Sequence, residues 1–222
     1  MFLDSDDLIP EDAIENMLNV AFKTQADIVQ GSWLDFTNKT KVEHHTNYNG
    51  IINNSKGILS GFPWGKLYKH HVLEHFCFPE GFWYEDTPIS FMLCARPYRF
   101  VALNNIVYWY RLNPDGISAT SPNYKKSVDS YWITELCLKE FQKFGLNYNQ
   151  NAYEYLLCQT IKNWGRTKKR PIGVRKAIFI LTAQLIEYYF PNYCTGQLEL
   201  LQIESAIKNK HFMQYELLMR GK

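Results

Sequence analysis

The spacing of apolar and polar positions in the first part of the chain predicts a mixture of helices and strands. Residues 12–24 carry apolar side chains three and four positions apart after Pro10, a pattern typical of an amphipathic helix. Residues 26–33 form a short, β-rich apolar run, which predicts a strand. The polar, Asn-rich segment 35–56 predicts loops or an edge hairpin.

Residues 61–97 continue this mixed pattern. A Gly-Pro turn leads into a predicted strand at 64–68, and a short helix is predicted at 70–76. Residues 87–97 predict a further helix with Pro88 in its first turn, where the missing backbone N–H costs no hydrogen bond.

The periodicity changes further along the chain. Two β-branched and aromatic runs, 98–105 and 106–112, are expected to pair as a hairpin with Asn104-Asn105 as its turn. Longer helices are then predicted over 123–144, 149–165, 173–190 and 195–218. The pattern predicts the α/β fold class for an N-terminal part and an all-α C-terminal extension after it.

Composition narrows the class of protein. The chain has 222 residues, of which 46% are hydrophobic, enough for a substantial buried core. The formal net charge is only +2, so we expect no nucleic-acid partner. Five cysteines without a CxxC pair favour reduced thiols and a cytoplasmic location. We find neither a signal peptide nor an apolar run near the ~20 residues that a membrane span needs.

The segment "FLDSDD" contains the first candidate chemistry. Apolar residues leading into Asp-x-Asp place Asp4 and Asp6 at the carboxyl end of a short strand, the edge at which α/β sheets usually bind ligands. Two residues apart on a strand, these side chains point the same way and can share one hard cation, Mg²⁺ or Mn²⁺. The alternative is that residues 4–7 are turn and helix-capping residues.

A second acidic pair, Glu85 and Asp86, precedes the helix predicted at 87–97. At a helix N-terminus the dipole and the free N–H groups favour a carboxylate and keep its pKa low. Capping is again the structural alternative. The functional alternative is a general base, which requires an accessible carboxylate on a rigid element.

Several segments together resemble the second half of bacterial family 2 glycosyltransferases with the GT-A fold. The resemblance covers residues 2–118, and it is carried by "FLDSDDLIPEDAIENML", "ADIVQGSW", "PWGKLYKHHVLEHFCFPEGFWYEDTPIS" and "YWYRLNPDGIS". It implies a partial GT-A (Rossmann-like) mixed sheet with helices over 1–118, followed by the helical extension over 119–222. It also implies an inverting enzyme that transfers sugar from a nucleotide-sugar, such as a UDP-sugar, to a glycan or lipid-linked glycan acceptor in cell-envelope polysaccharide biosynthesis (capsule, lipopolysaccharide or exopolysaccharide).

The same resemblance implies roles for the two acidic pairs. Asp6 falls on the metal ligand of the family's DxD motif, and Asp4 on a contact to the metal shell or the ribose. A divalent metal, Mn²⁺ or Mg²⁺, would neutralise charge on the leaving nucleoside diphosphate. Asp86 resembles the base that deprotonates the acceptor hydroxyl, while Glu85 positions the acceptor or the base, and these two roles could be exchanged.

Three further residues match positions near the donor. Lys66 and Arg111 are cations that could steady phosphate charge, and Trp64 could stack on a sugar ring. The structural alternatives are solvent exposure for Lys66, an ion pair for Arg111, and core or rim packing for Trp64.

The resembling enzymes carry further strands before the DxD motif, so we expect this chain to be a C-terminal portion lacking the N-terminal nucleotide-binding half. An unpaired sheet edge would then be covered by another chain or by self-association. One alternative is therefore a catalytically inactive fragment that acts as a binding or scaffolding subunit. Another is a haloacid dehalogenase-type phosphatase with Asp4 as nucleophile, although Leu8 stands where that family has a threonine.

The segment 166–176 carries six basic residues and no acidic one. Basic residues next to a membrane can each contribute about 1 kcal/mol of attraction to anionic lipid. A peripheral contact at the inner face of the plasma membrane is one interpretation of this segment, and a solvated helix junction is the other.

Overall fold

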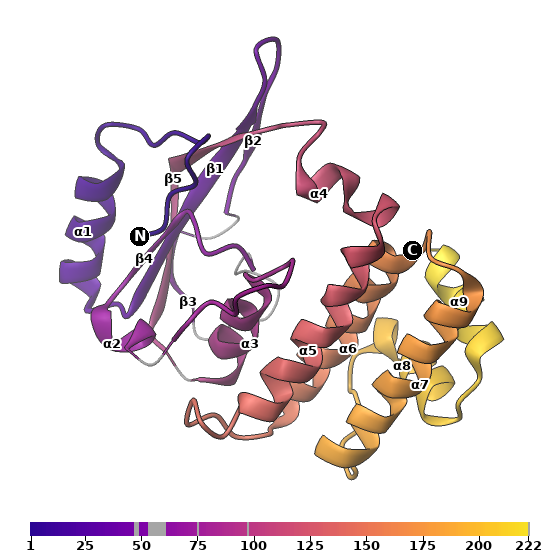
Figure 1. Ribbon diagram of the computed structural model, residues 1–222. Helices are drawn as coiled ribbons and strands as arrows, with labels where there is room; N and C mark the ends of the chain where they lie inside the picture. The colour runs from indigo at the N-terminus through magenta and orange to yellow at the C-terminus, as the bar shows by residue number, and fades with distance from the viewer. Residues whose placement is uncertain (47–48, 53–60, 75, 97, 222) are drawn as a thin grey trace. The chain divides into compact units, whose positions relative to one another are not determined.

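The computed structural model describes residues 1–222 except 47–48, 53–60, 75, 97 and 222 (Figure 1). The chain divides into two compact units, which are described separately below. The first unit comprises Met1–Phe78 and Met92–Gly116, and the second comprises Pro79–Phe91 and Ile117–Lys222.

The first unit is built on a five-stranded mixed sheet. Its two long strands, β1 (Ile28–Phe36) and β5 (Phe100–Arg111), are parallel neighbours. The short antiparallel strands β2 (Lys41–His44) and β4 (Lys66–Tyr68) pair with the other edge of β1, and β3 (Gly50–Ile52) pairs with β5. The strand predicted at 64–68 is confirmed over 66–68, and the edge-hairpin alternative for 35–56 is confirmed where β2 pairs with β1. Residues 47–48 and 53–56 of that segment lie outside the described residues.

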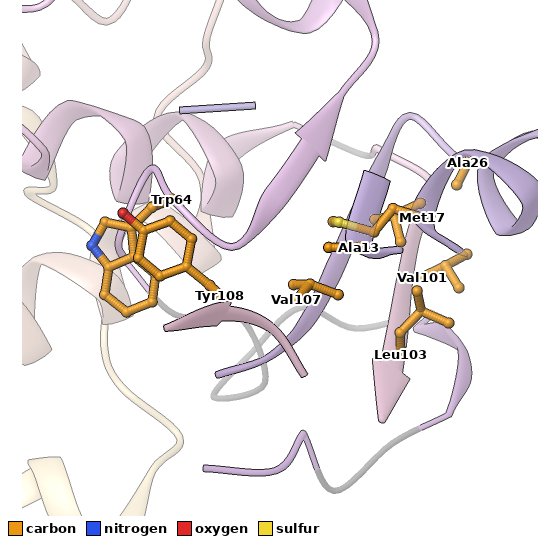
Figure 2. Close-up of a cluster of buried hydrophobic side chains, with 9 residues drawn as sticks. Ala13, Met17, Ala26, Trp64, Val101, Leu103, Val107 and Tyr108 are labelled. Atoms are coloured by element: carbon orange, nitrogen blue, oxygen red, sulfur yellow. The ribbon is translucent and has the colours of Figure 1, made fainter. Parts of the chain in front are cut away.

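Helix α1 (Ala13–Thr24) packs on this sheet as its apolar spacing predicts. Ala13 and Met17 are buried against Val29, Val101 and Val107 (Figure 2). Burying each larger apolar side chain stabilises the fold by roughly 1.5–3 kcal/mol. The short helix α2 (His70–Leu73) follows β4, and α3 (Thr87–Ala95) begins where Pro88 predicts a helix start.

The expected hairpin turn at 104–105 is wrong, because β5 runs through these two asparagines as one strand. From Gln30 to Ser32 the strand β1 advances two residues, while β5 advances four, from Ala102 to Ile106. The extra residues form a bulge, and both asparagines are exposed there. Pairing with a long parallel neighbour therefore overrides the turn propensity of Asn-Asn.

The second unit is helical, as the periodicity predicts. Its longer helices are α5 (Asp129–Glu140), α6 (Gln150–Thr167), α7 (Ile172–Tyr189), α8 (Leu198–Lys208) and α9 (Phe212–Arg220), and shorter turns precede them at α4 (Ile117–Thr120), η1 (Ser121–Asn123) and η2 (Lys125–Val128). The single helix expected over 195–218 is two helices, because Lys210 has a left-handed φ of 57° between α8 and α9. Among the described residues, no helix combines the length and the apolar character that crossing a membrane requires.

A buried ion pair joins α7 to α9. The guanidinium of Arg175 donates to both carboxylate oxygens of Glu216 at 3.0 and 2.8 Å, and the indole N–H of Trp164 donates to the same carboxylate at 2.9 Å. Burial alone would raise the pKa of Glu216, but these hydrogen bonds outweigh it and hold the pKa below its ordinary value. Glu216 is 3% exposed, so its charge depends on these partners.

Candidate functional site

The Asp-x-Asp segment forms a turn, the alternative that the sequence left open, and the short strand expected before it is reduced to a single bridge. Phe2 makes an isolated parallel bridge to Trp64, and the Asp7 backbone N–H donates to the Asp4 carbonyl at 3.2 Å. Leu8 then makes an antiparallel bridge to Trp109 on β5, with N···O distances of 3.1 and 2.8 Å. The turn is therefore fixed at both ends to the sheet of the first unit.

Asp7, which the sequence did not single out, is the carboxylate that anchors this turn. It is 7% exposed and accepts hydrogen bonds from the Tyr108 hydroxyl at 2.8 Å and the Arg111 backbone N–H at 2.7 Å. The same hydroxyl accepts from the Asp4 backbone N–H at 3.1 Å. Burial raises the pKa of Asp7, and the two hydrogen bonds partly offset that effect.

Because Asp7 supplies the anchor, Asp4 and Asp6 remain on the exposed side of the turn. Their carboxylates offer the oxygen ligands that Mg²⁺ and Mn²⁺ prefer. In the described part of the chain, no group of three or more His, Cys, Asp or Glu side chains is placed to hold a metal. A cation bound by Asp4 and Asp6 would thus need further oxygen ligands from a bound substrate or from water. The metal-binding roles of Asp4 and Asp6 stay predictions.

Arg111 lies beside this turn. Its Nε donates to the Asp6 carbonyl at 2.7 Å, and its guanidinium lies over the Phe36 ring at 4.5 Å. These contacts fix a positive charge next to the exposed carboxylates. Arg111 is therefore brought together with Asp4 and Asp6, as its predicted role near the donor requires.

Lys66 and Trp64 are both buried in the first unit. Lys66 is fully buried and its Nζ donates to the Phe62 carbonyl at 2.6 Å, so the solvent-exposed interpretation is wrong for it. Trp64 is 5% exposed and stacks on Phe62 and Tyr108 at 4.4 and 4.6 Å; Figure 2 shows the Tyr108 ring against the indole. This geometry favours the core-packing alternative for Trp64, and a donor contact for either residue stays a prediction.

The second acidic pair lies in the second unit, immediately before α3. Tyr84 has a left-handed φ of 64°, and its carbonyl accepts from the Thr87 N–H at 3.0 Å. The Asp86 carbonyl accepts from the Ile89 N–H at 3.1 Å in the first turn of the helix. Glu85 is exposed and Asp86 is partly buried, so the two neighbouring carboxylates have different environments.

Arg166, from α6, is a cation near this pair that the sequence did not assign to the site. Its guanidinium lies 3.8 Å from the centre of the Tyr84 ring, and its Nη1 donates to the Ser130 hydroxyl at 3.1 Å. Burial raises the pKa of Asp86 above its ordinary value, and the nearby charge of Arg166 offsets only part of that rise. Asp86 is therefore a partly buried carboxylate with a raised pKa and a cation nearby.

The basic segment 166–176 is only partly available to a membrane. Besides Arg166, the guanidinium of Arg175 pairs with Glu216, and Arg170 donates to the Pro122 carbonyl at 3.1 Å. The exposed basic residues are Lys168, Lys169 and Lys176. The exposed Lys169 ammonium also donates to Asn123 Oδ1 at 2.7 Å, so four of the six basic residues make hydrogen bonds within the helical unit.

Comparison with solved structures identifies the fold. The chain is similar to S. aureus TarS 1–349 in complex with UDP-GlcNAc, with a TM-score of 0.74, 17% identity, and coverage of 99% of this chain and 66% of that one. The UDP complex of TarS 1–349 gives a TM-score of 0.64 at 14% identity over 99% and 65% of the two chains. S. aureus TarS itself gives a TM-score of 0.68 at 15% identity over 99% and 39%.

The chain thus spans just under two thirds of the TarS 1–349 chains. Neither a protein-family model nor a curated protein matches the sequence. The mixed sheet and helices match part of a glycosyltransferase fold, which confirms the predicted fold class.

Proposed function

We propose that this chain forms the catalytic part, or a portion of the catalytic part, of an inverting glycosyltransferase that uses a nucleotide-sugar donor. The observation that carries the proposal is the fold match over 99% of the chain to TarS in complex with UDP-GlcNAc. The exposed acidic turn and the acidic pair before α3 supply the two kinds of carboxylate that such a transfer needs. The GT-A, family 2 assignment rests on the sequence resemblance alone.

On the donor side, Asp6 and Asp4 would hold Mn²⁺ or Mg²⁺, and the metal would neutralise charge on the departing nucleoside diphosphate. Arg111, fixed beside the turn, would add a second positive charge near the diphosphate. Asp7 and Tyr108 hold the backbone of the turn in place.

On the acceptor side, Asp86 would remove the proton from the acceptor hydroxyl as that oxygen attacks the anomeric carbon, with Glu85 orienting the acceptor or the base. A single displacement with one base inverts the anomeric centre. The Arg166 charge near Asp86 supports the role of base, because it favours the ionised carboxylate and offsets part of the rise in pKa that burial causes. The acceptor would be a glycan or lipid-linked glycan of the cell envelope.

The first test is calorimetric titration of the purified chain with UDP and then GDP, with and without Mn²⁺. We expect Mn²⁺-dependent binding of UDP that is lost in Asp6→Ala and retained in Glu11→Gln, a nearby exposed carboxylate that serves as the matched control. Absence of UDP binding by the native chain, or equal binding by both variants, would contradict a donor site at this turn.

A binding or scaffolding subunit is a second candidate, favoured by one observation. Ile14, Leu18 and Phe22 lie at four-residue intervals on α1 and are 43%, 38% and 72% exposed, which forms an apolar stripe. Self-association through this stripe predicts a dimer that Leu18→Glu converts to a monomer in light-scattering chromatography. A native chain that is already monomeric at high concentration would remove this support.

A further inference from the structure

A groove between α5 and α7 lies in the helical unit, and none of the residues discussed above lines it. Its cavity volume is about 650 Å³, and all of its lining residues come from these two helices. Figure 1 shows α5 and α7 within the helical part of the chain. Small-ligand pockets commonly have roughly 300–1,000 Å³, so the groove is large enough to bind a ligand of that size.

Three tyrosines form the aromatic part of the lining: Tyr131, Tyr188 and Tyr189. The Tyr188 ring is 78% exposed and lies edge-on to Tyr189, with centroids 4.8 Å apart and an interplanar angle of 85°. Burial raises the pKa of Tyr189, so the hydroxyl of this half-buried residue stays protonated at neutral pH and can donate a hydrogen bond. Tyr131 is 2% exposed and its hydroxyl is hydrogen-bonded to Glu135, so it forms the floor of the groove. An exposed ring beside a protonated hydroxyl offers an apolar face and a polar edge to the same ligand.

Each carboxylate of the groove pairs with an ammonium group. Glu135 pairs at 2.5 Å with Lys139 of the lining, and Glu187 pairs at 2.8 Å with Lys210, which is outside the lining. Each carboxylate thus has its own ammonium partner, so the groove presents hydrogen-bonding groups without an excess of either charge. Such a lining disfavours a phosphate and a quaternary ammonium ion, which need a net opposite charge or an uncompensated aromatic cage.

We propose that this groove binds a neutral oligosaccharide. The exposed Tyr188 ring stacks on the apolar face of a sugar, while Glu187 accepts hydrogen bonds from sugar hydroxyls and the Gln184 amide donates and accepts them. The ligand class follows from the aromatic, amide and charge-balanced lining. In this proposal the groove holds a segment of the acceptor glycan away from the reacting sugar, a role that rests on the proposed function.

The test is saturation-transfer NMR and titration of the full chain with neutral tetrasaccharides of β-1,4-linked N-acetylglucosamine, β-1,4-linked glucose and α-1,4-linked glucose. Choline and inorganic phosphate are the charged comparison ligands. We expect at least one tetrasaccharide to bind the native chain. Its dissociation constant should be about tenfold larger for Tyr188→Ala. Tyr124→Ala, which truncates a 54% exposed ring of the same residue type outside the groove lining, is the matched control and should leave the constant unchanged.

Two results would overturn the proposal: none of the tetrasaccharides binds, or Tyr188→Ala and Tyr124→Ala bind them equally well. Preferential binding of choline or phosphate in the groove would overturn it as well. Glu187→Gln keeps the shape of an exposed side chain and serves as a second variant, expected to weaken binding several-fold. UDP binding, measured in the same variants, is expected to be unchanged, so failure of the groove and failure of the donor site give different results.

Discussion

Replacing Tyr108 with phenylalanine tests whether β5 holds the acidic turn in place. Tyr108 is fully buried, and its hydroxyl joins the turn through two bonds, one donated to the Asp7 carboxylate and one accepted from the Asp4 N–H. Tyr108→Phe removes a single oxygen atom and leaves the ring stacked on Trp64. The substitution therefore isolates the two hydrogen bonds from the packing of the ring.

The two lost bonds differ in value. A hydrogen bond to a charged group contributes about 1.5–3 kcal/mol net, whereas water can replace the bond to the N–H of exposed Asp4 at a cost below about 1 kcal/mol. We therefore expect the turn to lose about 2 kcal/mol of local stability, which corresponds to roughly 30-fold faster amide exchange.

Hydrogen exchange of the backbone amides of Asp4, Leu8 and Arg111 measures this local stability, because each of them donates a hydrogen bond within the turn or to β5. Tyr110→Phe is the matched control: Tyr110 also stacks on Trp64, and in the described part of the chain its hydroxyl makes no hydrogen bond. Equal exchange rates in the Tyr108 and Tyr110 variants would refute the idea that the Asp7–Tyr108 bond holds the turn.

Three further predictions concern the helical unit. Asp86→Asn should lower the rate of sugar transfer by about 10²–10⁴-fold. Arg166→Gln should move the acidic limb of the pH–rate profile to higher pH, because the guanidinium lowers the pKa of Asp86. An acidic limb that does not move would count against Asp86 as the base. Glu216→Gln breaks a buried pair and should cost about 3–5 kcal/mol at pH 7. Because the pKa of Glu216 is lowered in the folded state, the native chain keeps this stability above about pH 4.5 and loses it as the pH falls through the folded value. The difference in free energy of unfolding between the native chain and Glu216→Gln, measured by urea denaturation, should therefore become smaller in acid. A difference that is constant with pH would contradict the pairing of an ionised Glu216 with Arg175. Charge reversal of exposed Lys168 and Lys169 to glutamate should reduce pelleting with anionic liposomes, and equal pelleting would argue for a solvated helix junction.

The sequence by itself determined the features that depend on neighbouring residues. The apolar spacing of 12–24 and the position of Pro88 predicted α1 and the start of α3 to within a residue or two. The same reasoning placed the second acidic pair at a helix start and gave a turn as the alternative for the first pair, because Asp and Glu satisfy free N–H groups there. These elements are encoded within a few residues of the chain, so they could be predicted without the fold.

Only the tertiary structure decided the features that depend on distant residues. It made β5 continuous through 104–105, because β1 supplied the partner strand. It buried Asp7 beside Tyr108, about a hundred positions along the chain, and left Asp4 and Asp6 exposed. It also brought Arg166 to Tyr84 and Asp86, although the sequence suggested a membrane role for that arginine. Burial and long-range hydrogen bonds decide which of several similar carboxylates or cations is structural and which is free to act, and local pattern does not contain that information.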